Sequence, residues 1–134
     1  MVEQTWEHFP QHELDCPCGC DGRMDSYFMD DVVVPMRKSL GFSMAIPKGG
    51  AYRCEYYDGK PGGAHQGRAI DIICSSRERF LIIDWLIRRN IRIDNGNLRG
   101  RKVTRIGINN GSIHIDDADS DYGKSEMVVW DYYK

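Results

Sequence analysis

Two histidines and one aspartate have the types and positions needed for a metal site. His65 follows the small residues Gly62-Gly63-Ala64, and Asp71 and His114 are each flanked by isoleucines. Two neutral imidazoles and a carboxylate are ligands that zinc accepts, and three of them leave one position of a tetrahedral ion open. Because a catalytic zinc ion needs an open position, the sequence predicts a catalytic metal site here.

Each candidate ligand also has a structural interpretation. A carboxylate between isoleucines needs a compensating partner, which for Asp71 is either a metal ion or an arginine such as Arg53 or Arg68. The other histidines, His8 and His12, lie in a proline- and glycine-punctuated stretch and are expected to be exposed polar residues.

The predicted strands would position these ligands. Residues 69–74 alternate as in a strand, with Asp71 on the face that carries Ala69 and Ile73. Residues 103–108 and 112–116 are two further strands, and Asn109-Asn110-Gly111 is their hairpin connection. The β-prone residues 127–133 predict a closing strand.

Two predicted helices would cover the sheet. The first begins at Asp25, carries an apolar residue every fourth position and ends at Gly41, with Pro35 expected to kink or split it. The second begins at a capping box over residues 75–78 and ends near Asn90. Residues 51–57 are expected to be extended. The predicted fold is α+β, a small mostly antiparallel sheet with flanking helices.

Composition limits the possible functions. The chain has 134 residues, 41% of them hydrophobic and 28% charged, and a net charge of -2. These values predict one domain over residues 1–134, with 1–23 as an irregular cysteine-containing lead-in, and no nucleic-acid partner. No apolar run is long enough for a membrane span, and residues 1–10 do not have the pattern of a secretory signal, so synthesis in the cytoplasm is expected.

The five cysteines leave two interpretations open. Cys16, Cys18 and Cys20 crowd into one turn-rich stretch, and without a signal peptide a disulfide framework is not expected. Cys16 and Cys20 alone have the spacing of a C-x2-4-C zinc knuckle, and Cys54 and Cys74 would complete a four-thiolate metal site with them if the fold brought these residues close. The alternative is reduced thiols in a turn and in the core.

Several stretches resemble the M15 zinc peptidases, the D-alanyl-D-alanine carboxypeptidase family. Residues 63–72, Gly-Ala-His-Gln-Gly-Arg-Ala-Ile-Asp-Ile, are similar to the family's S-x-H-x-x-G-x-A-x-D motif, and Ser112-Ile113-His114-Ile115-Asp116 resembles the strand with its last ligand. Residues 9–22 resemble the cysteine-containing lead-in of short phage-type members. Ala51-Tyr52-Arg53-Cys54 resembles their S-G-Y-R-C stretch, and Val129-Trp130-Asp131-Tyr132 their closing V-x-W-x-Y.

The resemblance implies a fold, a cofactor and a reaction. The fold would be of the lysostaphin/D-Ala-D-Ala carboxypeptidase/hedgehog type, with Zn²⁺ held by His65, Asp71 and His114. Arg53 would bind the substrate carboxylate or the developing oxyanion, unless it pairs with Glu55 or Asp58 instead. The reaction would be hydrolysis of peptide bonds in peptidoglycan stems or cross-links.

Two departures from the family pattern concern catalysis. The spacing from His65 to Asp71 is one residue shorter than in the family motif, and Gly111 stands where many members carry a catalytic glutamate. Hydrolysis needs a group that takes a proton from the attacking water. Asp116 is the first candidate because it shares a strand face with His114, and its alternative role is to orient that imidazole. Asp117 is the next candidate.

The expected protein is therefore a phage-derived peptidoglycan peptidase, acting at the host cell wall during lysis or from the virion. One alternative is a non-catalytic phage structural or wall-binding module that keeps the fold and the metal, which Gly111 favours. Another is a thiol-rich redox or zinc-scaffold protein built on Cys16 to Cys20.

Overall fold

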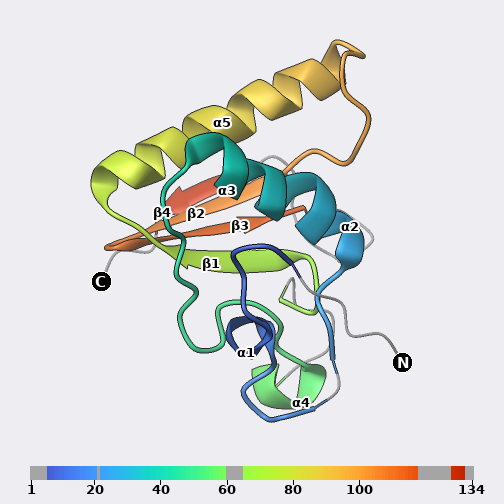
Figure 1. The fold of residues 1–134 in the computed structure, drawn as a ribbon, viewed down its shortest axis with the longest axis vertical. Coiled ribbons are helices and arrows are strands. Elements are labelled where there is room, and N and C mark those ends of the chain that lie inside the picture. Colours follow the sequence, from blue (N-terminus) through green and yellow to red (C-terminus); the bar gives the residue numbers. More distant parts are fainter. Residues whose placement is uncertain (1–5, 21, 60–64, 118–127, 132–134) are drawn as a thin grey trace.

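A four-stranded sheet lies at the centre of the computed structural model, which describes residues 6–20, 22–59, 65–117 and 128–131 (Figure 1). The strands are β1 (Ala69–Ile73), β2 (Arg105–Asn109), β3 (Ser112–Asp116) and β4 (Val128–Asp131), in the spatial order β1-β3-β2-β4. β3 pairs antiparallel with both β1 and β2, whereas β4 runs parallel to β2. The expectation of an α+β fold with a mostly antiparallel sheet is confirmed.

The hairpin between β2 and β3 forms where it was predicted. Its turn is Asn110-Gly111, and Gly111 has φ +80°, a conformation that glycine adopts without the penalty of a Cβ atom. The outer side of the edge strand β1 is covered, because the N–H groups of Asp71 and Ile73 donate to the carbonyls of Gly50 and Ala45. β1 therefore does not present a bare edge on that side.

The first predicted helix is split into three parts. α2 (Ser26–Phe28), the π-helical segment η1 (Met29–Val33) and α3 (Val34–Leu40) follow one another without a gap. Asp25 caps the start by accepting a hydrogen bond from the Phe28 N–H, and Gly41 ends α3 in the left-handed region. The wider π turn ends at Val33, two residues before Pro35, whose ring and missing N–H do not fit a continuous ladder of α-helical hydrogen bonds through the preceding turn.

The second helix, α5 (Ser76–Asp94), is longer than predicted. Ser75 and Glu78 form the expected capping box. The predicted end at Asn90 is wrong, because the Asn90 side chain does not cap the helix. Its amide instead donates to the carbonyl of Val103 at 2.7 Å and accepts from the Val103 N–H at 3.0 Å. Asn90 thus ties the helix to the chain leading into β2.

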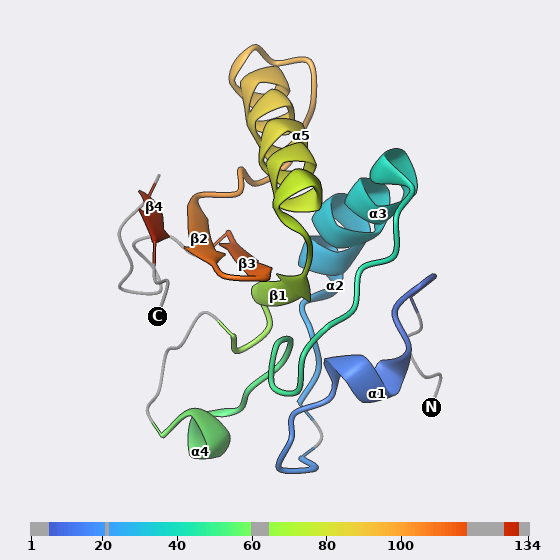
Figure 2. The ribbon, with the colours of Figure 1, turned by 90° about the vertical axis from the view of Figure 1, so that its left-hand side faces the viewer.

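Two layers lie on opposite sides of the sheet. Figure 2 shows α5 and the α2–α3 helix on one side, and α1 (Gln11–Leu14) and α4 (Glu55–Asp58) on the other. The helix side holds the main core, where β1 and β3 contribute fully buried isoleucines at positions 70, 72, 113 and 115. None of the described helices is long and apolar enough to cross a membrane.

The segments on the side of the sheet away from α5 contain two short helices that the sequence did not indicate. The lead-in contains α1 and contributes Trp6, Phe9 and Leu14 to the core. Residues 51–57 were expected to be extended, but the Cys54 sulfur accepts a hydrogen bond from the Tyr57 N–H and starts α4. Short polar-capped turns of this kind leave no periodic pattern in the sequence.

Candidate metal centre

The pairing of β1 with β3 brings two of the predicted ligands together. Asp71 lies directly opposite His114, while the neighbouring pairs Ile70–Ile115 and Ile72–Ile113 are buried on the other face. Since side chains alternate between faces along a strand, the burial of the isoleucines fixes Asp71 and His114 on the face away from α5. Directly opposed residues of an antiparallel pair have neighbouring side chains.

The third ligand comes from the turn before β1. His65 is 4% exposed and lies at the edge of the described chain, because Gly62-Gly63-Ala64 of the predicted motif fall outside the described residues. Its Nδ1 lies 2.8 Å from the carbonyl oxygen of Ala51, and its own carbonyl accepts the Arg53 N–H at 2.7 Å. Two hydrogen bonds to residues 51–53 thus hold His65 against the sheet.

The three ligand atoms form a small triangle. His114 Nδ1 lies 2.8 Å from Asp71 Oδ1 and 3.2 Å from His65 Nε2, and the His65–Asp71 separation is 3.4 Å. We call this grouping of His65, Asp71 and His114 the histidine–aspartate triangle. The Asp71 side chain is 23% exposed, so the triangle is accessible from one side.

The hydrogen bonds behind the imidazoles determine what faces the centre. The Ala51 carbonyl can only accept, so His65 Nδ1 carries a proton and Nε2 presents its lone pair to the triangle. His114 Nε2 lies 2.6 Å from Asp116 Oδ2 and in the same way donates outward, leaving Nδ1 for the triangle. When both imidazoles are neutral, the centre therefore contains three electron-rich atoms within 3.4 Å and needs a cation.

The pKa shifts of Asp71 and His114 also indicate that the centre of the triangle favours positive charge. Burial alone would raise the pKa of Asp71, but its contacts with the His114 and His65 imidazoles, which donate to the carboxylate when they are protonated, hold the pKa well below its ordinary range. Burial likewise opposes a charge on His114, yet its hydrogen bonds to Asp116 and Asp71 raise the pKa above its ordinary value. A proton on His114 and a metal ion thus compete for the same position.

The donor set fits zinc. With bonds of about 2.0–2.2 Å, two ligand atoms of a tetrahedral zinc ion lie roughly 3.3–3.6 Å apart. The separations of 3.2 and 3.4 Å from His65 are close to this edge, and the 2.8 Å contact would widen by about half an ångström. The carbonyl and carboxylate behind the two imidazoles are the usual partners of zinc-bound histidines.

Asp116, the first candidate for a catalytic base, lies behind His114 rather than beside the triangle. It is fully buried, contacts His114 on the ring nitrogen opposite the triangle, and lies 3.9 Å from Arg105 Nε. These contacts correspond to the second role considered for it, that of orienting the imidazole. The strand pattern correctly placed Asp116 on the same face as His114. It did not reveal that the His114 imidazole lies between the Asp116 carboxylate and the Asp71 carboxylate.

Asp117 is also engaged elsewhere. Its carboxylate accepts hydrogen bonds from Arg68 Nε at 2.6 Å and from Arg101 Nε at 2.8 Å, and its side chain is fully buried. Arg68, one of the arginines considered as a partner of Asp71, thus bonds Asp117. Burial raises the pKa of Asp117 in spite of these two guanidinium groups. The cluster fixes the chain immediately after β3.

Arg53 contacts the triangle through the backbone of His65. Its N–H bonds the His65 carbonyl, and its side-chain Nε is buried. Of the two acids weighed as its partners, Glu55 is exposed, and the side chain of Asp58 lies outside the described residues. The Ala51 carbonyl, which holds His65, was not predicted, because every residue type offers a backbone carbonyl.

The structure also gathers four of the five cysteines. Cys16, Cys18, Cys20 and Cys54 have sulfur atoms that all lie within 4.8 Å of one another. Cys74, the other cysteine considered for such a site, is buried in the hydrophobic core and donates its N–H to the Gly111 carbonyl. The four-thiolate site considered from the sequence combined Cys16 and Cys20 with both Cys54 and Cys74, whereas the structure groups Cys18 with the other three and leaves Cys74 out.

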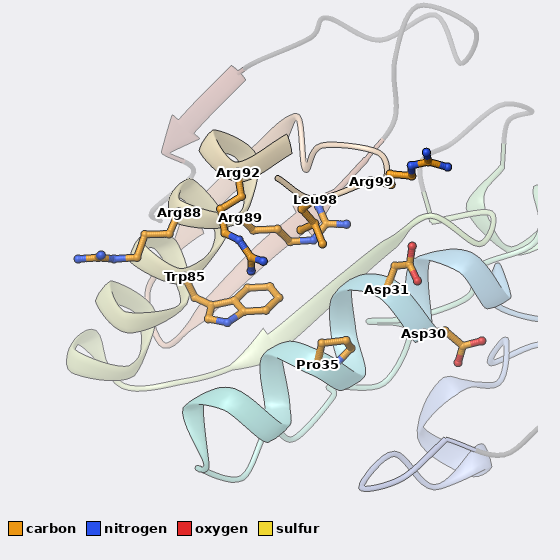
Figure 3. A pocket seen from close by; sticks show the side chains of 9 residues that line it. All are labelled: Asp30, Asp31, Pro35, Trp85, Arg88, Arg89, Arg92, Leu98 and Arg99. Carbon is orange, nitrogen blue, oxygen red and sulfur yellow. The ribbon is translucent and has the colours of Figure 1, made fainter. Parts of the chain in front are cut away.

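A pocket of about 500 Å³ lies on the other side of the sheet (Figure 3). It is formed by Trp85, Arg88, Arg89 and Arg92 of α5, by Leu98 and Arg99, and by Asp30, Asp31 and Pro35 of the facing helix. None of these residues belongs to the triangle or to the cysteine group. The pocket therefore has no part in the metal chemistry described above.

Comparisons with known proteins identify no relative of this chain. No protein-family model matches it, and neither a curated protein nor a solved structure was found to match. The sequence motifs and the geometry of the two ligand groups are therefore the basis for any assignment of function.

Proposed function

We propose that this protein is a zinc-dependent peptidase that hydrolyses peptide bonds in peptidoglycan stems or cross-links. The observation that carries the metal part is the histidine–aspartate triangle, in which each imidazole is fixed from behind and points its lone pair at a common centre. The substrate part is supported by the motif resemblance to M15 peptidases around His65, Asp71 and His114.

Zinc bound in such a site polarises a carbonyl and lowers the pKa of bound water, which supplies the nucleophile at neutral pH. The three ligands would hold the ion, and the Ala51 carbonyl and Asp116 keep the two imidazoles in the required tautomers and orientations. Arg53, bonded through its N–H to His65, would bind the substrate carboxylate or the developing oxyanion. Asp116 acts as a positioning residue in this proposal and not as the proton acceptor.

A digest of purified peptidoglycan by the zinc-loaded protein tests the proposal, with the products identified by mass spectrometry. We expect release of D-alanine or cleavage of stem peptides by the wild type, and none by His114→Ala or Asp71→Asn. Asp84→Asn is the matched control, because Asp84 forms an ion pair with Arg88 on the exposed surface of α5, on the side of the sheet away from the triangle. A wild-type protein that binds zinc but releases nothing contradicts the enzymatic proposal.

A second candidate function follows from the engaged carboxylates. Asp116 bonds His114, Asp117 bonds two arginines, and Gly111 lies at the hairpin turn, so three positions considered for a catalytic acid–base group do not face the triangle. This arrangement favours a non-catalytic wall-binding or phage structural module that retains the metal. Such a module would sediment with peptidoglycan without cutting it.

The site of action in either case would be the host cell wall, reached during phage lysis or from the virion. This part of the proposal is supported by the resemblance of the cysteine-containing lead-in to that of short phage-type members.

A further inference from the structure

The four clustered cysteines come from two separate parts of the chain. Cys16, Cys18 and Cys20 lie in one turn, where the Gly19 N–H donates to the Cys16 carbonyl and Gly19 has φ +82°. Cys54 is the N-cap of α4. The Cys18 sulfur lies 3.3 Å from that of Cys16 and 3.4 Å from that of Cys54.

Backbone amides point at these sulfurs. The Cys54 N–H donates to the Cys16 sulfur at 3.3 Å, and the Tyr57 N–H donates to the Cys54 sulfur at 3.4 Å. Hydrogen bonds of this kind stabilise negative charge on sulfur and are typical partners of metal-bound thiolates. A thiol buried for packing alone has no need of them, as Cys74 illustrates by its place among apolar core residues.

The arrangement has the size of a tetrahedral site. With zinc–sulfur bonds of about 2.3 Å, the sulfurs of a four-cysteine site lie roughly 3.8 Å apart. All four sulfurs lie within 4.8 Å of one another, so one ion at their centre would reach each of them. Two separate disulfides would instead draw the sulfurs into two pairs.

We propose that Cys16, Cys18, Cys20 and Cys54 bind one structural zinc ion, separate from the histidine–aspartate triangle. Four protein ligands close the coordination sphere and leave no position for substrate. The ion joins the lead-in to the start of α4, two segments that no sheet pairing connects in the described part of the chain. This inference does not depend on whether the protein cuts peptidoglycan.

The proposed ion would also support the triangle through the backbone of residues 51–54. Cys54 belongs to the cysteine cluster, and Arg53 and Ala51 hold His65 through the bonds described above. Between them, the Tyr52 N–H donates to the carbonyl of Leu14 at 3.2 Å, and the Tyr52 ring lies against Gly22 so closely that a Cβ atom there would overlap it. The cysteine cluster and the triangle thus share one short segment of backbone.

Metal analysis of the purified protein tests the proposal. We expect two zinc ions per wild-type chain, and one in each of Cys18→Ser, Cys54→Ser and Asp71→Asn. The matched control Cys74→Ala removes a thiol outside the cluster and should keep two. An unchanged zinc content in both cluster variants would overturn the proposal, as would iron in place of zinc in the wild type.

A second measurement avoids the risk that a cluster variant fails to fold. Thiols of the native wild-type protein are titrated with a coloured disulfide reagent before and after a strong chelator. We expect the four cluster thiols to be protected until the chelator removes the ion. Thiols that react at the same rate in both samples, or a disulfide found by mass spectrometry without reductant, would overturn the proposal.

Cobalt substitution separates this proposal from the proposed peptidase site. Thiolate ligands give cobalt an intense charge-transfer absorption, which histidine and carboxylate ligands do not. The band should persist in Asp71→Asn and disappear in Cys54→Ser. A band that disappears in Asp71→Asn instead would contradict a separate cysteine site, whereas loss of peptidoglycan cleavage alone would leave it intact.

Discussion

The two ligand groups of this protein differ in what holds their members in place. Asp71 and His114 are paired across two hydrogen-bonded strands whose other faces are buried in the core, so the sheet positions them before any ion arrives. The four cysteines lie in a turn and at the cap of a four-residue helix. A helix of that length has little stability of its own.

This difference separates two uses of a metal. An ion in the triangle would find its ligands already ordered, so its loss leaves the strands that carry Asp71 and His114 in place. An ion in the cysteine cluster would order the segments that bind it, so its binding energy becomes folding energy. The predictions below test this contrast, beginning with the largest expected effect.

The largest expected effect is on thermal stability. Loss of the proposed cluster ion through Cys54→Ser should cost on the order of 4 kcal/mol, which corresponds to a fall in Tm of roughly 15 °C for a chain of this size. Asp71→Asn removes a triangle ligand while keeping the side-chain shape, and its Tm should fall by less than about 5 °C. Thermal melts followed by circular dichroism measure both.

Chelation of the wild type provides the control. It should lower Tm by about as much as Cys54→Ser, and it should change the Tm of Cys54→Ser little. If Asp71→Asn instead lost as much stability as Cys54→Ser, the triangle would be structural and the contrast would fail.

The next effect concerns the residue behind His114. Asp116→Asn keeps the side-chain shape but removes the negative charge that holds the imidazole at 2.6 Å. Loss of such a partner typically lowers metal affinity about 10–100-fold. Competition with a coloured zinc chelator measures the triangle, and the thiol protection of the cysteine cluster should not change.

Asp84→Asn on the surface of α5 is the matched control and should leave both sites unaltered. If Asp116→Asn kept full zinc affinity but lost turnover, Asp116 would be a catalytic group after all, and the role assigned from its contacts would be wrong.

A smaller effect is expected from pH. The pKa of His114 is raised above its ordinary value of about 6.5, so its proton competes with the ion up to a pH above that value. Below the raised pKa, each unit of acidification should weaken zinc binding at the triangle about tenfold through this one proton. Asp71, whose pKa is lowered, is already ionised and adds nothing in this range.

Calorimetry of zinc binding to Cys54→Ser in buffers of different ionisation enthalpy measures the released proton. A zinc affinity that stays constant between pH 5 and 7 would show that His114 does not hold the ion.

The strand patterns of the sequence predicted the sheet, and the structure brings the three predicted ligands within reach of one another. Alternation along residues 69–73 and 112–116 fixes which side chains share a face, and the burial of the isoleucines restricts the β1–β3 register in which Asp71 lies opposite His114. The Asn-Gly turn fixes only the register of β2 against β3. His65 was predicted from its position after small residues and from the motif. The α+β class followed from the same strand and helix patterns.

The parts of the fold and of the cysteine cluster that the sequence did not predict depend on single contacts rather than on periodic patterns. The Asn90 side chain binds Val103, so the helix passes through the expected end. Cys54 caps α4 with its sulfur, so a segment predicted as extended turns into a helix. Cys74, which the sequence analysis included in the possible four-thiolate site, lies in the core instead, because long-range packing decides its position and no local pattern encodes that packing.

The smallest expected effect concerns Gly111, where the resemblance would place a catalytic glutamate. Gly111 lies at the hairpin turn, three residues before His114, which puts their Cα atoms about 10 Å apart along the strand. A glutamate there would not reach the triangle, so Gly111→Glu should leave turnover and zinc affinity unchanged. A glutamate held at the left-handed φ of +80° that Gly111 adopts should cost about 1 kcal/mol of stability.

Gly96→Glu is the matched control, because Gly96 has φ +78° and, like Gly111, has open space where a Cβ atom would lie. Urea unfolding should give the two variants similar losses, since the strain is the same. A rise in peptidoglycan cleavage in Gly111→Glu but not in Gly96→Glu would mean that the turn reaches the substrate. The acid–base group of this protein would then be sought at the hairpin and not around the sheet-held ligands.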